Sequence, residues 1–419
     1  MARALVACGV AAIAYATLTP SAQPPMPLSF CVACGELGGV DVVLNVLLFL
    51  PLGMGLAMSG WSRWRAIGMM SAASVSIELL QLFLIPGRDA SLGDVLSNSV
   101  GGALGFLIGA HVHQLIWPDR TFDRRLVAAS SAAWLVGTTL ACLALVPLPS
   151  RSAYFGQLAR ELGGHPAYPG RVISARFANA PFPDEEFPDA LSVARALRDG
   201  PAAQTELVIL DHQGTADPRA IARIADSEEN EILQIGEENR DLIFGVRTYA
   251  SGFRLRPIVL RMRAVLPAGT EAGKRGDTLR ITTEYLPPRA VMRVSNGLEE
   301  HRAALLMTPA QAWRAIAPIQ LDIDGSAAGA ALDACFLFVV ALPVGYWAAA
   351  AGARDRFTLV NLGVVSVALL LGLAEGPLLF RLATPRWWEV VGQVAGVACG
   401  SGLALIIARH RLPVGARAA

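Results

Sequence analysis

The stretch from Asp41 to Ser59, DVVLNVLLFLPLGMGLAMS, decides the fold class because it is apolar along almost its whole length. A run of about 20 apolar residues is long enough to cross the hydrocarbon core of a bilayer as a helix. Seven further apolar runs lie at 4–18, 66–86, 95–117, 126–148, 327–350, 358–380 and 387–408. The sequence therefore predicts an integral membrane protein with about eight transmembrane helices.

The composition supports a membrane protein and excludes one class of partner. Hydrophobic residues make up 53% of the 419 residues and charged residues only 16%, whereas soluble domains average about 25% charged residues. The formal net charge is +1. A nucleic-acid-binding protein needs a basic surface, so no nucleic-acid partner is expected.

A long polar region between the fifth and sixth apolar runs divides the chain into several domains. We expect a transmembrane domain over residues 1–148, an inserted domain over 149–326 and C-terminal transmembrane helices over 327–419. In the insert, short β-branched or alternating runs separated by turn-forming residues predict strands. These runs lie at 171–177, 205–210, 221–224, 231–235, 242–248, 258–265, 278–285 and 291–294. Many short strands favour an all-β jelly roll or sandwich, with a short helix over 191–197 at its edge.

Arginine is distributed unequally between the two sets of short loops and chain ends. One set holds eleven: Arg3, Arg63, Arg65, Arg120, Arg124, Arg125, Arg354, Arg356, Arg409, Arg411 and Arg417. The other holds three: Arg88, Arg381 and Arg386. Because cytoplasmic loops are enriched in positive charge, both termini are predicted to be cytoplasmic and residues 149–326 extracytoplasmic.

Two of the six cysteines lie in a polar loop, at Cys31 and Cys34. No histidine or second cysteine pair is nearby, so this C-x-x-C lacks the ligands of a zinc site. A local disulfide is one possibility if the loop faces an oxidising compartment, and two free thiols are the other. The remaining cysteines lie in apolar runs, where thiols are usually buried and inert.

A polar cluster gathers near the predicted outer ends of the second to fourth helices: Asp41, Asn45, Glu78, Gln81, Arg88, Asp94 and Asn98. Spacings of three or four residues place the members of each helix on one face. Charged groups inside a membrane are costly and usually face a cavity or one another. We therefore predict one shared pocket with Arg88 as counter-charge. For Asp41 or Asp94 alone, an interfacial carboxylate favoured by the helix dipole is the simpler alternative.

The spacing within the polar cluster resembles a known family. The motifs are D-x3-N-x3-F-x-P-x-G from Asp41 to Gly53, E-x-x-Q from Glu78, and R-x5-D-x3-N-x3-G from Arg88 to Gly102. Together they resemble the VanZ-like family of bacterial membrane proteins, over residues 1–117. That family is named for a protein linked to resistance to teicoplanin, a glycopeptide antibiotic that acts on cell-wall precursors. The resemblance implies a cell-envelope protein of the bacterial inner membrane that affects teicoplanin susceptibility, and it implies no particular reaction.

The inserted domain resembles a laminin-G-like, concanavalin-type jelly roll. The resemblance rests on residues 223–227, 230–235 and 241–248. It implies a glycan or envelope-protein partner, with calcium in some members. Oxygen ligands for calcium could come from Asp226, Glu228 and Glu229. No calcium-loop signature is present, and a solvated acidic turn is the simpler alternative, so neither a metal site nor another cofactor is assigned.

The last three apolar runs repeat features of the second to fourth. The matched pairs are Asp41/Asp333, Pro51/Pro343, Gly53/Gly345, Glu78/Glu375, Arg88/Arg386, Asp94/Glu389 and Asn98/Gln393. Leucines replace the two amides, with Leu337 at the position of Asn45 and Leu378 at that of Gln81. A degenerate, parallel four-plus-four repeat explains this pattern, and chance similarity between apolar runs is the alternative. In the first case the second unit is mainly structural.

Ligand binding is the preferred function. The carboxylates of the polar cluster would orient the polar group of a membrane lipid or lipid-linked envelope precursor, its amides would hydrogen-bond that group, and Arg88 would pair with phosphate. An intramembrane enzyme with Glu78 or Asp94 as general acid or base is one alternative. No Ser/His, Cys/His or metal-ligand set supports it, so no catalytic residue is assigned. A transporter is the other alternative, but no polar path continues toward the cytoplasmic side.

Overall fold

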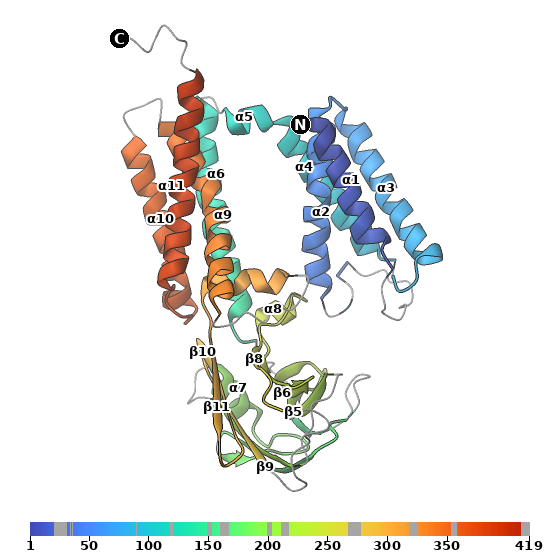
Figure 1. Cartoon of the computed structure of the whole chain (residues 1–419), viewed down its shortest axis with the longest axis vertical. Helices are drawn as coiled ribbons and strands as arrows, with labels where there is room; N and C mark the ends of the chain where they lie inside the picture. Colours follow the sequence, from blue (N-terminus) through green and yellow to red (C-terminus); the bar gives the residue numbers. More distant parts are fainter. Residues whose placement is uncertain are drawn as a thin grey trace.

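The computed structural model describes residues 1–20, 32–33, 35, 37–88, 90–117, 120–148, 153–159, 167–198, 203–210, 218–266, 278–317, 326–352 and 358–411. Two helical bundles stand side by side, and a β-sheet region lies beyond one end of both (Figure 1). The N-terminus lies at the opposite end. We call the two ends of the bundles the domain end and the terminal end.

The first bundle contains α1 (Ala2–Leu18), α2 (Gly38–Met58), α3 (Arg63–Leu84) and α4 (Leu92–Ala110). The second contains α6 (Arg120–Leu145), α9 (Ala327–Gly352), α10 (Thr358–Leu379) and α11 (Trp387–Arg411). Six of these helices are long and apolar enough to cross a membrane, whereas α1 and the Gly363–Leu379 part of α10 are apolar but shorter. The prediction of a multi-pass membrane protein is confirmed, with six candidate spans and two shorter apolar helices.

The fourth helix ends earlier than predicted. At His111 the backbone leaves helical geometry, with φ −106° and ψ 9°, and the short helix α5 (Val112–Ile116) runs across to the second bundle (Figure 1). The expectation of one helix over 95–117 is therefore wrong. Apolar composition alone does not distinguish a helix that continues from one that turns along the edge of the bundle.

The β-sheet region contains two antiparallel sheets. The first has the order β1 (Tyr154–Leu158), β5 (Arg219–Asp226), β6 (Glu231–Glu238), β7 (Asp241–Val246), β8 (Leu260–Met262). The second has the order β11 (Glu300–Leu306), β10 (Arg289–Ser295), β9 (Thr278–Leu286), β4 (Ala203–Leu210), β2 (Arg171–Phe177), β3 (Ala180–Pro181). All eight predicted strands are present, and α7 (Ala190–Arg198) covers the predicted short helix.

The two sheets share one hydrophobic core. Alternate side chains of β9, among them Leu279, Ile281 and Tyr285, are buried in the same cluster as Ile224 and Ile235 of the first sheet. This alternation is the period-two pattern that predicted strands here. Burial also raises the pKa of the Tyr285 phenol. Among the strands that the sequence did not predict, β11 begins with Glu-His-Arg and lacks an apolar start.

Two short helices join the β-sheet region to the bundles. They are α8 (Tyr249–Gly252) and the 3-10 helix η1 (Pro309–Ile316). Just after α8, the Arg254 carbonyl oxygen accepts the Gly39 backbone N–H at 3.0 Å. At Gly39 a Cβ atom would lie only 2.2 Å from the Phe253 carbonyl oxygen, so the chain from α8 sits directly on the first turn of α2. The segment η1 contacts both α9 and α2, which places it between the two bundles.

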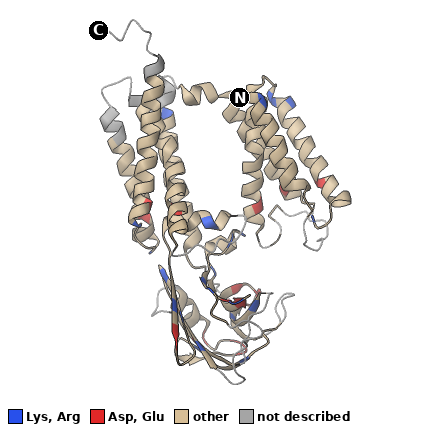
Figure 2. Ribbon diagram, viewed as in Figure 1, with Lys and Arg blue, Asp and Glu red and all other residues tan. Residues whose placement is uncertain are grey.

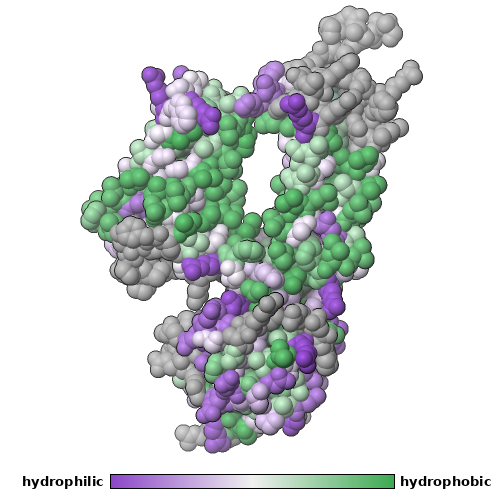
Figure 3. All heavy atoms as spheres, turned by 180° about the vertical axis from the view of Figure 1, so that it is seen from behind, coloured by the Kyte–Doolittle hydropathy of each residue, from purple (hydrophilic) through white to green (hydrophobic). Residues whose placement is uncertain are grey.

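Charged and hydrophobic residues occupy different parts of the molecule, as they do in a membrane protein. Acidic residues lie near the domain ends of helices in both bundles (Figure 2). Hydrophobic side chains dominate the bundle surfaces, including the visible walls of an opening between the bundles (Figure 3). Exposed apolar residues on the first bundle include Leu47, Phe83 and Leu96. Such a surface needs a nonpolar surrounding such as lipid chains.

Candidate functional site

The structure places all members of the polar cluster at the domain end of the first bundle. Asp41 lies in the first turn of α2 and Asp94 in the first turn of α4. Near the end of α3, Glu78 and Gln81 are buried, and Asn98 is buried one turn along α4 from Asp94. Arg88 lies in the connection between α3 and α4. The common depth predicted from the sequence is therefore present in the fold.

Hydrogen bonds connect the three helices through these side chains. The Asn45 amide donates to Asp94 Oδ1 at 2.9 Å and joins α2 to α4. Glu78 Oε2 accepts the backbone N–H of Ser91, just before α4, at 2.8 Å. The Asn98 amide donates to Ser74 Oγ of α3 at 3.0 Å. Four of the predicted residues, Asn45, Glu78, Asp94 and Asn98, thus join α4 to α2 and α3 at this end of the bundle.

Gln81 and Arg88 hold the end of α1 instead. The Gln81 amide donates to the Thr17 carbonyl at 2.9 Å. The Arg88 guanidinium donates through Nε to Thr19 and through Nη2 to Ala16, at 3.0 and 2.8 Å. The last carbonyls of a helix have no partner within the helix, so these two side chains cap α1. In the part of the chain that the structure describes, Arg88 forms no ion pair with a carboxylate of the polar cluster.

A second arginine near the polar cluster comes from the β-sheet region. Arg256, after α8, bonds to η1 through its backbone N–H to Ala315 and its Nε to Ala317. Burial lowers the pKa of Arg256, and the nearby Asp41 carboxylate acts in the opposite direction. Sequence reasoning missed Arg256, because a separation of more than two hundred residues gives no local signal for this proximity.

Several oxygen acceptors of the polar cluster remain open. The Asn98 side chain is 2% exposed and that of Gln81 7%. Among the described residues, neither Asn98 Oδ1 nor Gln81 Oε1 has a hydrogen-bond partner. Asp41 is exposed and accepts no hydrogen bond from any residue of the described ranges. A buried polar atom without a partner is costly, so the site has an unused capacity to accept hydrogen bonds.

Close helix packing fixes the positions of these groups. A Cβ atom at Gly101, Gly105 or Gly109 of α4 would lie 2.3, 2.1 or 2.5 Å from the carbonyl oxygens of Val46, Leu50 and Met54 of α2, respectively. These distances are shorter than any van der Waals contact, so only glycine lets the two backbones approach this closely. The small-xxx-small spacing in the sequence is thereby explained, and it brings Asn45 within reach of Asp94.

The second bundle has a carboxylate site at the same end, and η1 fills it. Asp333 of α9 is fully buried. It accepts the Trp313 indole N–H at 2.9 Å and Arg314 Nη2 at 3.3 Å on both oxygens. Glu389 of α11, also fully buried, accepts the Thr308 hydroxyl at 2.7 Å. No sequence pattern indicated that Thr308, Trp313 and Arg314 would contact the carboxylates of the second bundle.

The helices of the second bundle pack in the same manner as α2 and α4. A Cβ atom at Gly392, Gly396 or Gly400 of α11 would lie 2.3, 2.3 or 2.1 Å from the carbonyl oxygens of Ala334, Phe338 and Leu342 of α9. In both bundles, glycines of the last helix therefore meet backbone carbonyls of a proline-containing helix, α2 or α9.

The acidic turn that was considered as a source of calcium ligands has a structural role. Asp226 is 3% exposed. Its carboxylate accepts the backbone N–H groups of Glu228 and Asn230 at 3.0 and 2.8 Å and pairs with Arg247 at 3.3 Å. Its oxygens therefore hold the β5–β6 turn. No group of three or more metal-ligating side chains occurs within the described ranges.

The predicted disulfide pair, Cys31 and Cys34, lies outside the described residues. The described cysteines Cys8, Cys142, Cys335 and Cys399 are free thiols. The expectation of burial is confirmed for Cys142, whereas Cys8, Cys335 and Cys399 are exposed on the helix surfaces. A disulfide between Cys31 and Cys34 therefore stays a prediction, with two free thiols as its alternative.

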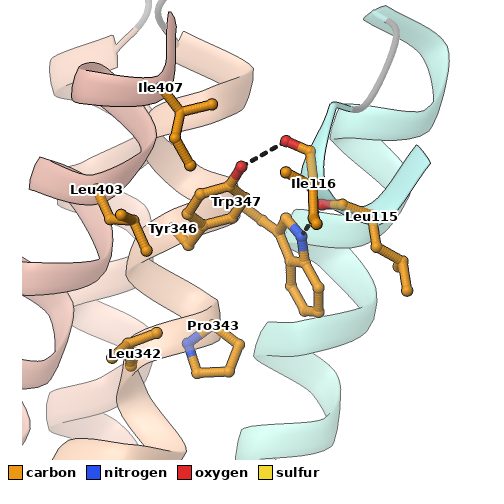
Figure 4. Close-up of a pocket in the computed structure, with 8 residues that line it drawn as sticks. All are labelled: Leu115, Ile116, Leu342, Pro343, Tyr346, Trp347, Leu403 and Ile407. Atoms are coloured by element: carbon orange, nitrogen blue, oxygen red, sulfur yellow. Dashed lines mark hydrogen bonds between the residues drawn. The ribbon is translucent and has the colours of Figure 1, made fainter. Parts of the chain in front are cut away.

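An apolar pocket of 320 Å³ lies at the terminal end, away from the polar cluster. Its lining residues come from α5, α9 and α11: Leu115, Ile116, Leu342, Pro343, Tyr346, Trp347, Leu403 and Ile407 (Figure 4). Trp347 Nε1 donates to the Leu115 carbonyl at 3.0 Å, and the Tyr346 hydroxyl donates to the Ile116 carbonyl. The two polar atoms of the lining side chains are thus used to hold α5, which leaves the pocket wall hydrocarbon.

Residues 10–112 match the family model described as VanZ/LLP1. This segment is a VanZ/LLP1 family domain. Comparison of the chain with curated proteins and with solved structures found no match. The matched residues contain the second half of α1 and all of α2, α3 and α4, so the VanZ/LLP1 domain holds the complete polar cluster. The second bundle and the β-sheet region lie outside the VanZ/LLP1 domain.

Proposed function

We propose that the VanZ/LLP1 domain binds the polar group of a lipid-linked or amphiphilic cell-envelope ligand at the domain end of α2, α3 and α4. One observation carries this proposal: oxygen atoms of Asp41, Asn98 and Gln81 that accept no hydrogen bond from the described residues lie at the domain end of a tightly packed bundle. Polar groups in such a position commonly serve a ligand or a path. The exposed apolar side chains beside them suit the hydrocarbon part of an amphiphile.

The proposal includes the orientation and the site roles. The domain end faces the extracytoplasmic side, which the arginine distribution supports. Asp94 and Glu78 hold the site in shape through Asn45 and the Ser91 backbone, while Asp41 and the open amide oxygens meet the ligand. Arg88 positions α1 and keeps further N–H groups for a phosphate. The β-sheet region contributes a glycan or envelope-protein contact, and a laminin-G-like fold for it remains part of the proposal.

We also propose that α9–α11 are a degenerate copy of α2–α4. The sequence pairs Asp41/Asp333, Asp94/Glu389 and Asn98/Gln393 support this. The glycine contacts add support because Gly101 and Gly396 meet the carbonyls of Val46 and Phe338, which occupy matching positions after the paired aspartates. In addition, Asn98 Oδ1 and Gln393 Oε1 are both buried without a partner in the described structure.

Teicoplanin susceptibility tests the proposed function in a cell. A sensitive host expressing the protein is compared with one expressing a Glu78→Gln/Asp94→Asn variant at the same membrane abundance. We expect protection by the wild type and its loss in the variant, because both substitutions change the carboxylates that shape the site. A Glu206→Gln/Glu284→Gln variant removes the same number of charges from the second sheet and serves as the matched control.

Retained protection in the Glu78→Gln/Asp94→Asn variant would separate the phenotype from the polar cluster and overturn the proposed site.

Turnover distinguishes a binder from the enzymatic alternative. A purified protein that, present in substoichiometric amount, converts many equivalents of a lipid-linked precursor would be a catalyst, with Glu78 or Asp94 as the first candidates for general acid or base.

A further inference from the structure

The apolar pocket at the terminal end is built from three helices that are far apart in the sequence. Its wall comes from α9, α11 and the last two residues of α5 (Figure 4). Two hydrogen bonds from α9 hold the same end of α5: Trp347 Nε1 donates to the Leu115 carbonyl at 3.0 Å, and the Tyr346 hydroxyl donates to the Ile116 carbonyl. The pocket therefore lies at the junction where α5, which comes from the first bundle, meets the second.

The pocket wall accepts hydrocarbon and not water. Every lining residue is Leu, Ile, Pro, Tyr or Trp, and both polar side-chain atoms among them donate to backbone carbonyls of α5. A buried water needs roughly two to four polar partners, which this wall does not offer. The volume of 320 Å³ lies at the lower end of the range for ligand pockets, about 300–1,000 Å³. The space therefore suits one hydrocarbon segment.

The pocket lies at the depth of the lipid chains. Leu342 lies eight residues before Ala350, where the candidate span of α9 ends, and Leu403 lies five residues before Ala408, where that of α11 ends. With a rise of 1.5 Å per residue, these positions are about 7–12 Å inside the spans. Leu403 is 45% exposed and Ile116 37%, so the pocket opens to the surroundings of the helices. At this depth those surroundings are hydrocarbon.

The chain's own connections at the terminal end have the wrong chemistry for this pocket. The segments that follow α5, α9 and α11 carry the charged residues Asp119, Arg354, Asp355, Arg356 and Arg417. Placing such segments at hydrocarbon depth is costly. An empty pocket is unfavourable as well, because the atoms of its wall lose dispersion contacts on one side. A lipid chain fills the space without either cost.

A second observation places lipid chains next to α5. This helix also borders the opening between the two bundles (Figure 1), and the visible walls of that opening are hydrophobic (Figure 3). At the domain end, η1 contacts both α2 and α9. With α5 at one end and η1 at the other, the bundles are held apart and the opening stays accessible to hydrocarbon. Lipid chains can therefore reach the junction of α5 with the second bundle.

We infer that one acyl chain of a phospholipid, from the leaflet at the terminal end, lies in this pocket and packs α5 against α9 and α11. The chain is a structural lipid: it adds dispersion contacts to Ile116 and Leu403, while the hydrogen bonds of Tyr346 and Trp347 fix the position of α5. All lining residues lie outside residues 10–112 and at the opposite end from the polar cluster. The inference is thus independent of the proposed function.

Photoaffinity labelling of the full chain in phosphatidylcholine nanodiscs tests the inference. The probe is phosphatidylcholine with a diazirine in the middle of one acyl chain, and labelled residues are mapped by mass spectrometry. Labelling of 342–347 and 403–407 is compared with that of 364–367 in α10, which lie at a similar distance from the terminal end of their helix and include the exposed Val364 and Val367. We expect the pocket residues to be labelled about fivefold more, because a held chain keeps contacts that a passing lipid loses.

Two tryptophan variants of α11 provide a matched pair. Leu403 and Leu405 are exposed to similar extents, 45% and 42%, but only Leu403 lines the pocket. A Leu403→Trp variant places an indole in the pocket and should reduce labelling there about fivefold, to the level of α10. A Leu405→Trp variant should label like the wild type. Because both positions are on the helix surface, neither substitution disturbs the core of the bundle.

Each other outcome overturns the inference. Equal labelling of the pocket and α10 would make the pocket an ordinary lipid-facing surface. Pocket labelling that is unchanged in Leu403→Trp would place the chain elsewhere. Labelling of α10 without the pocket would mean that protein fills it, from this chain or a second copy. Stronger labelling by a diazirine-tagged polyprenyl phosphate than by phosphatidylcholine would replace the acyl chain with an isoprenoid. These results leave the proposed function untouched, since that is tested by variants of the polar cluster.

Discussion

Arg314 and Asp333 form an ion pair in which one guanidinium nitrogen lies 3.3 Å from each carboxylate oxygen, with the Asp333 side chain fully buried. The two residues belong to different parts of the protein. Arg314 lies in the last turn of η1, which follows the last strand of the β-sheet region, and Asp333 lies in the candidate span α9. The pair is therefore a polar connection between the β-sheet region and the second bundle.

Loss of Arg314 should destabilise the protein strongly. An Arg314→Met variant leaves the buried Asp333 carboxylate without its charge partner, and breaking a buried ion pair from one side costs about 3–5 kcal/mol in the free energy of unfolding. Thermal unfolding in detergent measures the loss. An Arg280→Met variant breaks the exposed pair with Glu206 and should cost at most about 1 kcal/mol. Equal effects of the two variants would show that the buried pair does not hold η1 in place.

Close packing of α2 against α4 should not tolerate a side chain at Gly105. A Gly105→Leu variant places Cβ 2.1 Å from the Leu50 carbonyl oxygen, so the helices must separate, at a cost of about 1–3 kcal/mol or more. The matched control is Gly68→Leu in α3, where no heavy atom lies within 4 Å of the added Cβ. We expect a lower melting temperature for Gly105→Leu alone. A Gly105→Leu variant as stable as the control would refute the close contact.

Membrane orientation predicts opposite labelling of two introduced cysteines. Leu298, in the β10–β11 turn, is 95% exposed, and Trp61, between α2 and α3, is 45% exposed at the terminal end. In a Cys31→Ser/Cys34→Ser background, Leu298→Cys should react with a membrane-impermeant maleimide on intact cells. Trp61→Cys should react with the same maleimide only after the membrane is permeabilised. The reverse pattern would place the domain end in the cytoplasm.

Attachment of α5 to the second bundle should depend on Trp347. A Trp347→Phe variant keeps the aromatic ring but loses the hydrogen bond to the Leu115 carbonyl, which is worth about 0.5–1.5 kcal/mol. Hydrogen exchange followed by mass spectrometry should show faster exchange over residues 112–116 and unchanged exchange in the β-sheet region. Unchanged exchange in α5 would mean that the Tyr346 contact is sufficient to hold it.

The sequence by itself determined most of the helices and strands and the depth of the polar cluster. Long apolar runs define the candidate spans because a spanning helix must satisfy its backbone internally and face lipid. Alternating runs such as Thr278–Leu286 define the strands because one face of each is buried. The position of a polar residue within an apolar run gives its depth directly, since a helix rises by a fixed amount per residue. Asp41 and Asp94 could therefore be assigned to one end of the bundle from the sequence.

Only the tertiary structure decided which groups meet across the chain. Arg314 reaches Asp333 and Arg256 approaches Asp41 from the β-sheet region, and neither contact has a local sequence signal. Arg88 was predicted as the counter-charge of the carboxylates, and in the fold its guanidinium donates to the backbone carbonyls of Ala16 and Thr19 at the end of α1. Contacts of this kind depend on how separate elements pack. Periodicity and spacing describe one element at a time, so they fix what each helix carries and leave its partners to the fold.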